Sequence, residues 1–385
     1  MVWELSAVNV GTGLPLEGVR VLDLSRVLAG PLAAMIAGDL GADVIKVEGP
    51  RGDPVRALAP PYFGDDATYY LAVNRHRRNV VADLLDPGDF AAVEALVRRA
   101  DAVIENFLPA QYAELHIERL RRVNPGCVWV SVTPASSSST LSREPSFDVL
   151  AQARSGLMGV TGARGGEPTK VGAPVADVVT GLYGAIALVT GLYARLAGRP
   201  GRHFEVPLLE STMSALVNQA QGYLATGVAP RRLGNDHPSI APYGAVRTRD
   251  GLLMLAVGTD AQFERLVLAL GAPATAPWEH WRRNDQRVAD RDVLRGALEE
   301  VFTTRDTTHW LERLTSSGVP HAPILDVDGA FDQVAVRDGD FVGEMDSPRG
   351  PVRTLRSPLR IDGVRPEVRS GPRRLGQDSA ELLGR

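Results

Sequence analysis

The first 135 residues alternate between short apolar runs and stretches with helical spacing, and this alternation restricts the fold more than any other feature. Runs at 18–24, 43–48, 79–84, 102–107 and 127–134 are rich in β-branched residues, which is typical of strands. Helical stretches separate them, and one begins near Pro31 because proline suits the first position of a helix. We therefore predict an α/β, Rossmann-like large domain with a mostly parallel sheet and helices on both faces.

The carboxyl ends of these strands are the expected place for a ligand, because parallel sheets bind ligands there. The ends read SRVLAGP (25–31), VEGPRGD (47–53), ENFLP (105–109) and VTPASSSS (132–139). The first lacks the G-x-G-x-x-G pattern of a dinucleotide site, and the chain has no phosphate-binding loop ending in GK[ST]. Enzymes that use NAD or ATP are therefore disfavoured.

The chain of 385 residues is too long for one compact core, so we expect two domains. After residue 235 a hairpin is indicated at Asp250-Gly251, followed by a helix with Thr259 or Asp260 as N-cap and helices near 289–302 and 307–316. We predict a large domain over 1–200, a linker over 201–235, a smaller α+β domain over 236–325, and a return segment over 326–385 that completes the large domain.

Charge, cysteine content and histidine spacing limit which partners, metal sites and cellular compartments we expect. A net charge of -4 without blocks of like charge gives no reason to expect nucleic acid. The single cysteine, Cys127, excludes an internal disulfide and fits a cytoplasmic protein, and the N-terminal MVWELSAVNVGTG does not resemble a signal peptide. The seven histidines are scattered, so we expect no metal site. The uncharged stretch 178–194 contains three glycines, and we interpret it as a helix in a soluble core rather than a membrane span.

Asp177 stands at the head of that helix, in PVADVVTGLYGA (174–185). One interpretation is an N-cap, whose carboxylate accepts a hydrogen bond from the amide of Val179 or Thr180. The other is a nucleophile, which the positive end of the helix holds ionised. The glycines indicate that another backbone packs closely. The residues with helical spacing, expected to be buried, are Val178, Leu182, Ala185, Ile186, Val189, Leu192 and Leu196.

Eight stretches in sequence order resemble the class III CoA-transferases, the family of formyl-CoA transferase and carnitine CoA-transferase. They are LEGVRVLDLSRVLAGP (16–31), LGADVIKVEGPRGDPVR (40–56), the asparagine-arginine of LAVNRHRRNVVADL (71–84), DAVIENF (101–107), FDVLAQARSGLMGVTG (147–162), ADVVTGLYGAIALVTGLYAR (176–195), RRLGNDHPSIAPY (231–243) and SGVPHAPILDV (317–327). The resemblance covers the chain from about residue 16 onward.

The resemblance implies that Asp177 attacks an acyl-CoA thioester and passes CoA to a carboxylic acid through an aspartyl anhydride and an aspartyl-CoA thioester. Coenzyme A is then a substrate, not a permanently bound cofactor. The resemblance also implies an interlocked homodimer. The implied CoA-binding residues are Arg26, Val27, Leu28, Ala29, Asn106 and Phe107. Gly49 and Leu108 stand where relatives often have basic residues. We therefore expect the CoA phosphates to be bound by some combination of Arg26, Arg51, Arg75 and Arg78.

Two other functions remain open at this point. The α-methylacyl-CoA racemases share the resemblance, but they need a histidine before the aspartate of the FDVLAQ segment, and here that position is Phe147. A non-catalytic protein that binds CoA esters is the other alternative.

Overall fold

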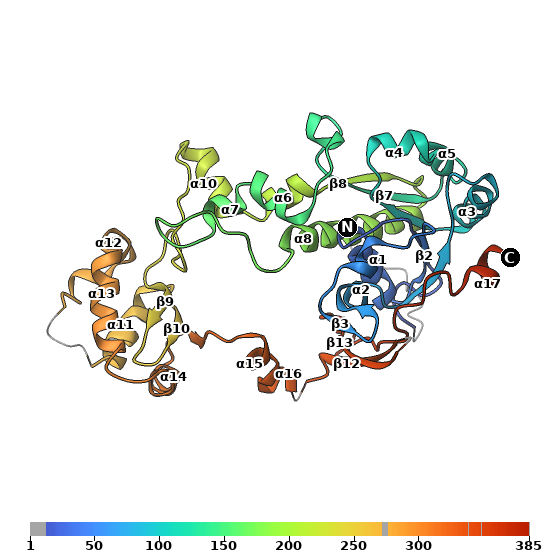
Figure 1. Ribbon diagram of the computed structural model, residues 1–385. Helices are drawn as coiled ribbons and strands as arrows, with labels where there is room; N and C mark the ends of the chain where they lie inside the picture. Colours follow the sequence, from blue (N-terminus) through green and yellow to red (C-terminus); the bar gives the residue numbers. More distant parts are fainter. Residues whose placement is uncertain (1–12, 272–275, 338, 348, 385) are drawn as a thin grey trace, which may run out of the picture. The chain divides into compact units, whose positions relative to one another are not determined.

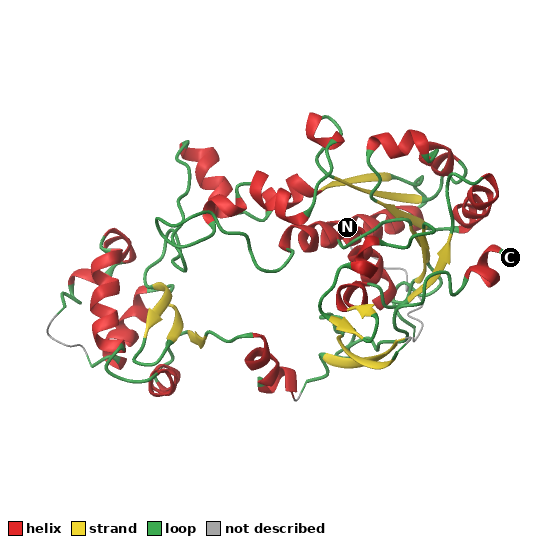
Figure 2. Cartoon of the chain, viewed as in Figure 1, coloured by secondary structure: helices red, strands yellow, loops and turns green. Residues whose placement is uncertain are grey.

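A computed structural model describes residues 13–271, 276–337, 339–347 and 349–384 (Figures 1 and 2). The chain divides into two compact units. Unit 1 combines Met1–Leu157, Lys170–Val228 and Val334–Arg385, and unit 2 combines Met158–Thr169 and Ala229–Gln333. The N-terminal segment in which we expect no signal peptide lies, apart from Gly13, outside the described residues.

Unit 1 is built on a six-stranded sheet in which every neighbouring pair is parallel, with the order β5-β2-β1-β6-β7-β8. This confirms the α/β class and the parallel sheet. The strands are β1 (Arg20–Asp23), β2 (Asp43–Glu48), β5 (Arg77–Val81), β6 (Ala102–Glu105), β7 (Val128–Thr133) and β8 (His203–Pro207). Five of them match predicted runs. The edge strand β8 was not predicted, because HFEVP is short and mixes polar with apolar residues.

Helices cover both faces of this sheet. Those of unit 1 are α1 (Ala29–Asp39), α2 (Thr68–Val73), α3 (Pro87–Arg99), α4 (Pro109–Glu114), α5 (Ile117–Arg122), α6 (Asp148–Arg154), α8 (Val175–Leu196), α9 (Leu208–Ser214), α10 (Asn218–Thr226), α16 (Val334–Arg337) and α17 (Ser379–Leu383). Single-turn 3-10 helices span Pro54–Ala57 and Thr140–Arg143, and two small antiparallel pairs complete the unit: β3 (Tyr62–Phe63) with β4 (Asp66–Ala67), and β12 (Val342–Ser347) with β13 (Gly350–Leu355). The short helix α7 (Leu157–Val160) comes where the chain leaves unit 1.

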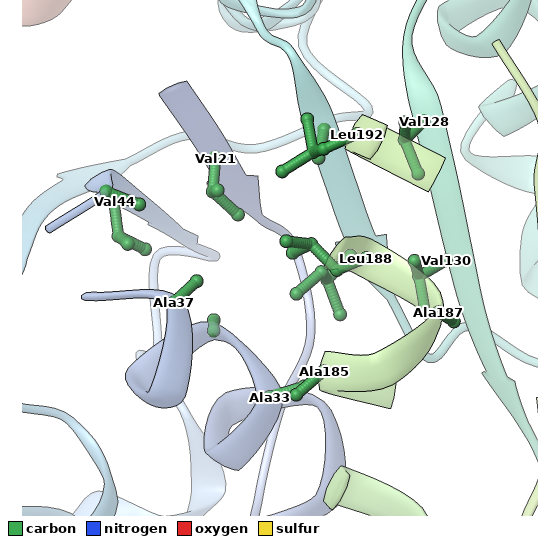
Figure 3. Packing of buried hydrophobic residues seen from close by; sticks show 14 of the residues in the cluster. Val21, Ala33, Ala37, Val44, Val128, Val130, Ala185, Ala187, Leu188 and Leu192 are labelled. Carbon is green, nitrogen blue, oxygen red and sulfur yellow. The ribbon is translucent and has the colours of Figure 1, made fainter. Parts of the chain in front are cut away.

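One core layer lies between the sheet and the helices α1 and α8. Ala33 and Ala37 of α1 and Ala185, Leu188 and Leu192 of α8 pack against the strand valines in this layer (Figure 3). A second layer, which includes Phe90, Val93, Ile117 and Leu120, buries helices α3 and α5 on the opposite face. The two layers fix the ends of the strands, where the candidate site lies.

The face that α8 buries differs from the expected one. Gly181, Gly184 and Gly191 point inward, and a Cβ added at Gly181 would lie 2.9 Å from the Ala29 carbonyl oxygen. The prediction that another backbone packs closely on these glycines is therefore confirmed at Gly181, whereas Gly184 meets the Ala33 side chain and Gly191 meets the side chains of Val128 and Phe204.

The larger apolar side chains of α8 turn outward instead. Leu182, Ile186, Val189 and Leu196 are 41–88 % exposed, so their predicted burial is wrong, whereas Ala185 and Leu192 are buried as expected. The reason is that glycine permits the closer helix contact, and this contact decides the orientation of α8. By length and composition alone α8 is apolar enough to cross a membrane, and half of its apolar window is buried inside the protein.

The C-terminal segment runs along the outer edge of the sheet. The Gly376 amide donates to Asn79 Oδ1 (2.6 Å), the Asp378 amide donates to the Asn79 carbonyl (2.9 Å), and Ser379 Oγ accepts from the Val81 amide (3.0 Å). These bonds cover the polar backbone of β5, which would otherwise be an open edge.

Unit 2 is a small α+β structure around its own core. Its sheet has the order β11-β10-β9, all antiparallel, with β9 (Tyr243–Arg247), β10 (Leu252–Ala256) and β11 (His321–Pro323). The hairpin at Asp250-Gly251 is confirmed, and Thr259 is the N-cap of α11 (Asp260–Ala269). A 3-10 turn at His280–Arg282 and the helices α12 (Asn284–Ala289), α13 (Arg291–Phe302), α14 (Thr307–Ser316) and α15 (Val327–Asp332) follow.

Candidate active site

A cavity of about 290 Å³ opens at the carboxyl ends of β1, β6 and β7, within unit 1. Of the predicted site residues it brings together six: Arg26, Val27, Leu28, Ala29, Asn106 and Asp177. The rest of its lining comes from Pro54, Leu108, Gln111, Val132, Thr133, Pro134, Pro145, Ser146, Phe147 and Leu208. Residues up to 182 positions apart in the sequence, Arg26 and Leu208, thus face one space of mainly apolar walls.

A second cavity of about 150 Å³ shares Arg26 with the first. It lies at the ends of β1, β2 and β5 and includes Phe107, Gly49 and Asp83 in its lining. The Arg26 guanidinium lies over the Phe107 ring, 5.6 Å from the centroid, and donates from Nη2 to Gln111 Oε1 (3.3 Å). Arg26 is therefore the one predicted cation that borders both cavities.

The loop after β1 is fixed by side chains from other strands. The Arg26 amide donates to Asn106 Oδ1 (3.0 Å), and Asn106 Nδ2 donates back to the Arg26 carbonyl (2.9 Å). The Val27 amide donates to Asp53 Oδ1 (3.1 Å). Val27 has a φ of 70°, a left-handed conformation that a β-branched residue rarely adopts. Asn106 thus acts here as a clamp on the loop, and together with Asp53 it stabilises a strained backbone.

Asp53 belongs to a network of buried charged side chains. Lys46, 1 % exposed, lies 2.9 Å from Asp53 Oδ2 and 3.8 Å from Asp23 Oδ2, and donates to the Ser25 carbonyl (2.8 Å). Arg77 lies 3.0 Å from Asp23. Two cations and two carboxylates therefore balance one another in the protein interior, which buried charges require. This network was not predicted, although Lys46 in the middle of an apolar strand was a visible sign of it.

Asp177 is not the N-cap of α8, and that interpretation is corrected. The N-cap is Pro174, which places Asp177 third in the helix. Asp148 Oδ1, from α6, accepts from the amides of Ala176 (2.8 Å) and Asp177 (3.4 Å). Because proline has no side-chain acceptor, the carboxylate of Asp148, 29 residues before Asp177, takes the place of the cap.

The charge state of Asp177 also differs from the expected one. Burial, together with the negative charge of Asp148, raises the pKa of Asp177 to about 7. The prediction that the helix terminus holds the carboxylate strongly ionised is wrong, because burial and a like charge favour the neutral acid. Burial, together with the carboxylates of Asp177, Asp148 and Asp53, raises the pKa of Tyr69 on α2 to about 12, so this hydroxyl stays protonated.

The remaining arginines proposed for phosphate binding lie elsewhere. Arg75 is buried and donates to both carboxylate oxygens of Asp39 (2.6 and 2.7 Å). Asp39 ends α1, about 15 Å along the helix from the cavity. Arg78 pairs with Asp43 at the amino end of β2. Arg51 is exposed and follows the Gly49 of the second cavity without lining it.

Phe147 lines the larger cavity and is 58 % exposed, and no histidine occurs among the described residues around this space. The α-proton transfer of a racemase therefore has no imidazole at this position. In the described part of the chain, no group of three or more histidine, cysteine, aspartate or glutamate side chains is placed to hold a metal ion.

Comparison with known proteins gives matches over nearly the whole chain. The model of CoA-transferase family III matches residues 16–379. A succinate–glutarate CoA-transferase of Agrobacterium fabrum is 38 % identical, over 96 % of this chain and 95 % of the relative. An acetyl-CoA:oxalate CoA-transferase of Acetobacter aceti is 35 % identical, with the same two coverages. The crystal structure of a CAIB/BAIF family protein from Brucella suis superposes with a TM-score of 0.85 at 35 % identity, over 97 % of this chain and 99 % of that one.

Proposed function

The chain belongs to CoA-transferase family III, and we propose that it moves CoA from an acyl-CoA to a free carboxylic acid through covalent intermediates on Asp177. The observation that carries this proposal is that Asp177 lines the same cavity as the Arg26–Ala29 loop and Asn106. A nucleophilic carboxylate and a set of candidate CoA contacts therefore share one space at the carboxyl edge of the sheet.

The proposed reaction has four exchange steps. The Asp177 carboxylate attacks the thioester carbonyl, and the C–S bond breaks to give a mixed anhydride and CoA thiolate. The thiolate attacks the aspartyl carbonyl and expels the donor carboxylate, which leaves an aspartyl-CoA thioester. The acceptor carboxylate attacks that thioester and releases the thiolate again. The thiolate then attacks the acceptor's acyl carbon, which releases the new acyl-CoA and the Asp177 carboxylate without net proton transfer.

The cavity walls suit such intermediates, because both the anhydride and the thioester would react with water. Leu28, Pro134, Phe147 and Leu208 give the larger cavity apolar surface. We assign the acyl and thioester end of the substrate to this cavity and the nucleotide end of CoA to the second one. Arg26, which borders both, is then our first candidate to bind a phosphate, and Arg51, two residues after the Gly49 of the second cavity, is an additional one.

The relatives point to short dicarboxylic acids as the first acids to test, since their names specify succinate, glutarate and oxalate. We also propose a cytoplasmic, interlocked homodimer. The outward apolar side chains of α8 support the dimer, because Leu182, Ile186 and Val189 are 41–59 % exposed within one chain. Native mass spectrometry measures the subunit number directly, and a monomer at micromolar concentration would contradict the dimer.

The test of the proposed function is a screen of acyl-CoA donors against free acids by mass spectrometry, with hydroxylamine or borohydride to trap the adduct on Asp177. We expect exchange and a trapped adduct in the wild-type protein. Asp177→Ala and Asp177→Asn should bind CoA but lose both signals. A wild-type protein that incorporates deuterium at the acyl α-carbon without exchanging acids would overturn the proposal in favour of a racemase.

A further inference from the structure

The helix that carries the proposed nucleophile begins without a cap of its own. Pro174 precedes its first residue and offers no side-chain acceptor, so the amides of Ala176 and Asp177 need a partner from elsewhere. Asp148 supplies it through a single oxygen, Oδ1. The backbone of Asp177 is therefore attached to α6, a separate helix.

The second oxygen of Asp148 is also used. Gln152 Nε2 donates to Asp148 Oδ2 (2.7 Å), and Gln152 Oε1 accepts from the Val171 amide (2.8 Å). The Gln152 side chain is fully buried, so both ends of its amide group are satisfied inside the protein. This chain of bonds holds the first turn of α8 and the segment before it against α6, whose neighbour Phe147 lines the cavity.

We propose that Asp148 is the positioning residue of Asp177: its carboxylate replaces the missing cap of α8 and so fixes the direction in which Asp177 enters the cavity. This inference rests on the proposed function of Asp177. Asp148 does not line the cavity, so it acts through Asp177 and not on the substrate. Loss of a helix cap weakens the first turn of the helix, and a small displacement of a reacting group strongly lowers the reaction rate.

The charge of Asp148 has a second consequence. Acylation converts the Asp177 carboxylate into a neutral anhydride or thioester, which removes one of two neighbouring negative charges. The Asp148 carboxylate therefore favours the acylated protein over the free one. Three titratable or charged groups interact with Asp177 or share its cavity. They are Asp148 on α6, whose charge adds to burial in raising the Asp177 pKa, Tyr69 on α2, whose own pKa Asp177 helps to raise, and Arg26 in the same cavity lining.

Two substitutions separate the hydrogen bond from the charge. Asp148→Asn keeps an oxygen that accepts from the helix amides but loses the charge and the acceptor for Gln152, whereas Asp148→Ala loses all three. The measurement is single-turnover acylation of Asp177, followed as a mass adduct, with the acyl-CoA that the wild-type protein uses. Glu144→Ala is the matched control, because Glu144 is an exposed acid near α6 whose ion pair is with Arg154.

We expect acylation to slow about tenfold or more in Asp148→Ala while the Kd for CoA changes less than about twofold. In Asp148→Asn the acylation rate at pH 8 should recover, the acid limb of its pH profile should move to lower pH, and the fraction of acylated protein at equilibrium should fall. Glu144→Ala should match the wild type.

Wild-type acylation in Asp148→Ala would overturn the inference. Equal losses in both variants, together with lost CoA binding, would also overturn it, since they indicate general damage to the fold. If the wild-type protein itself forms no adduct on Asp177, the proposed function fails first, so the two failures are distinguishable.

Discussion

Replacing Asp177 by asparagine should stabilise the fold while it abolishes transfer, because the asparagine amide has no charge to be disfavoured. Burial and the neighbouring Asp148 raise the Asp177 pKa from 3.8 to about 7. Each unit of pKa difference corresponds to about 1.4 kcal/mol, so the ionised carboxylate costs the folded state at most about 4 kcal/mol. The side chain keeps some solvent contact, and screening reduces the expected gain to about 1–2 kcal/mol.

The sign of the pH dependence follows from the direction of the shift. A carboxyl group with a raised pKa in the folded state destabilises the protein fully above pH 7, less as the pH falls, and not at all below the unfolded-state pKa of 3.8. The stability gain of Asp177→Asn should therefore be largest at pH 8 and shrink toward pH 4. In the wild type, kcat/KM should fall about tenfold per unit as the pH drops below 7, because the proposed reaction needs the carboxylate.

Thermal unfolding of both proteins at pH 8 and pH 5 measures this difference, which should amount to a few degrees in Tm at pH 8. Glu118→Gln is the control, since Glu118 lies in the first turn of α5, is 49 % exposed, and should change stability by less than about 0.5 kcal/mol at either pH. An Asp177→Asn protein that is no more stable at pH 8, or whose gain does not vary with pH, would refute the reasoning.

Three further outcomes follow from the packing and the ion pairs. Gly191→Ala should lower stability by about 1–3 kcal/mol, because its Cβ would lie 2.4 Å from the buried Val128 side chain. Gly222→Ala, in open space on α10, should raise stability by about 0.5 kcal/mol; thermal unfolding compares the two variants, and equal effects would contradict this prediction. Asp53→Ala should cost about 3 kcal/mol, measured in the same way, because its lysine partner is almost completely buried, and a loss below 1 kcal/mol would argue against the buried charge network. Arg26→Ala should raise the Kd for CoA about tenfold by calorimetry, whereas Arg75→Ala should act on stability instead, and the reverse result would reassign the phosphate contact.

Sequence patterns predicted five of the six sheet strands and the cavity at their carboxyl ends, because these depend on local composition and on general rules for parallel sheets. They failed for α8, where periodicity assigned the larger side chains Leu182 and Ile186 to the core. The helix instead turns Gly181 and Gly184 to α1 and Gly191 to the sheet, at contacts too close for a larger side chain.

The parts of the site that the sequence did not reveal are all long-range contacts. Nothing near Arg75 in the sequence shows that Asp39 will neutralise it, and nothing near Pro174 shows that Asp148 will replace the cap. Motif resemblance singled out Asp177 as the candidate nucleophile, but the raised pKa of Asp177 comes from burial and from a residue on another helix. Such properties arise only when separate segments meet.

The bonds between the C-terminal segment and β5 have a consequence for biosynthesis. Residues 376–379 complete the edge of a sheet whose other strands are made in the first 207 positions. During translation, most of unit 2 (Ala229–Gln333) is synthesised before the last segment of unit 1. Throughout that time, unit 1 lacks the C-terminal residues that cover β5. The nascent large unit therefore presents an open strand until synthesis has passed residue 379, and a chain stalled before that point would be the aggregation-prone form.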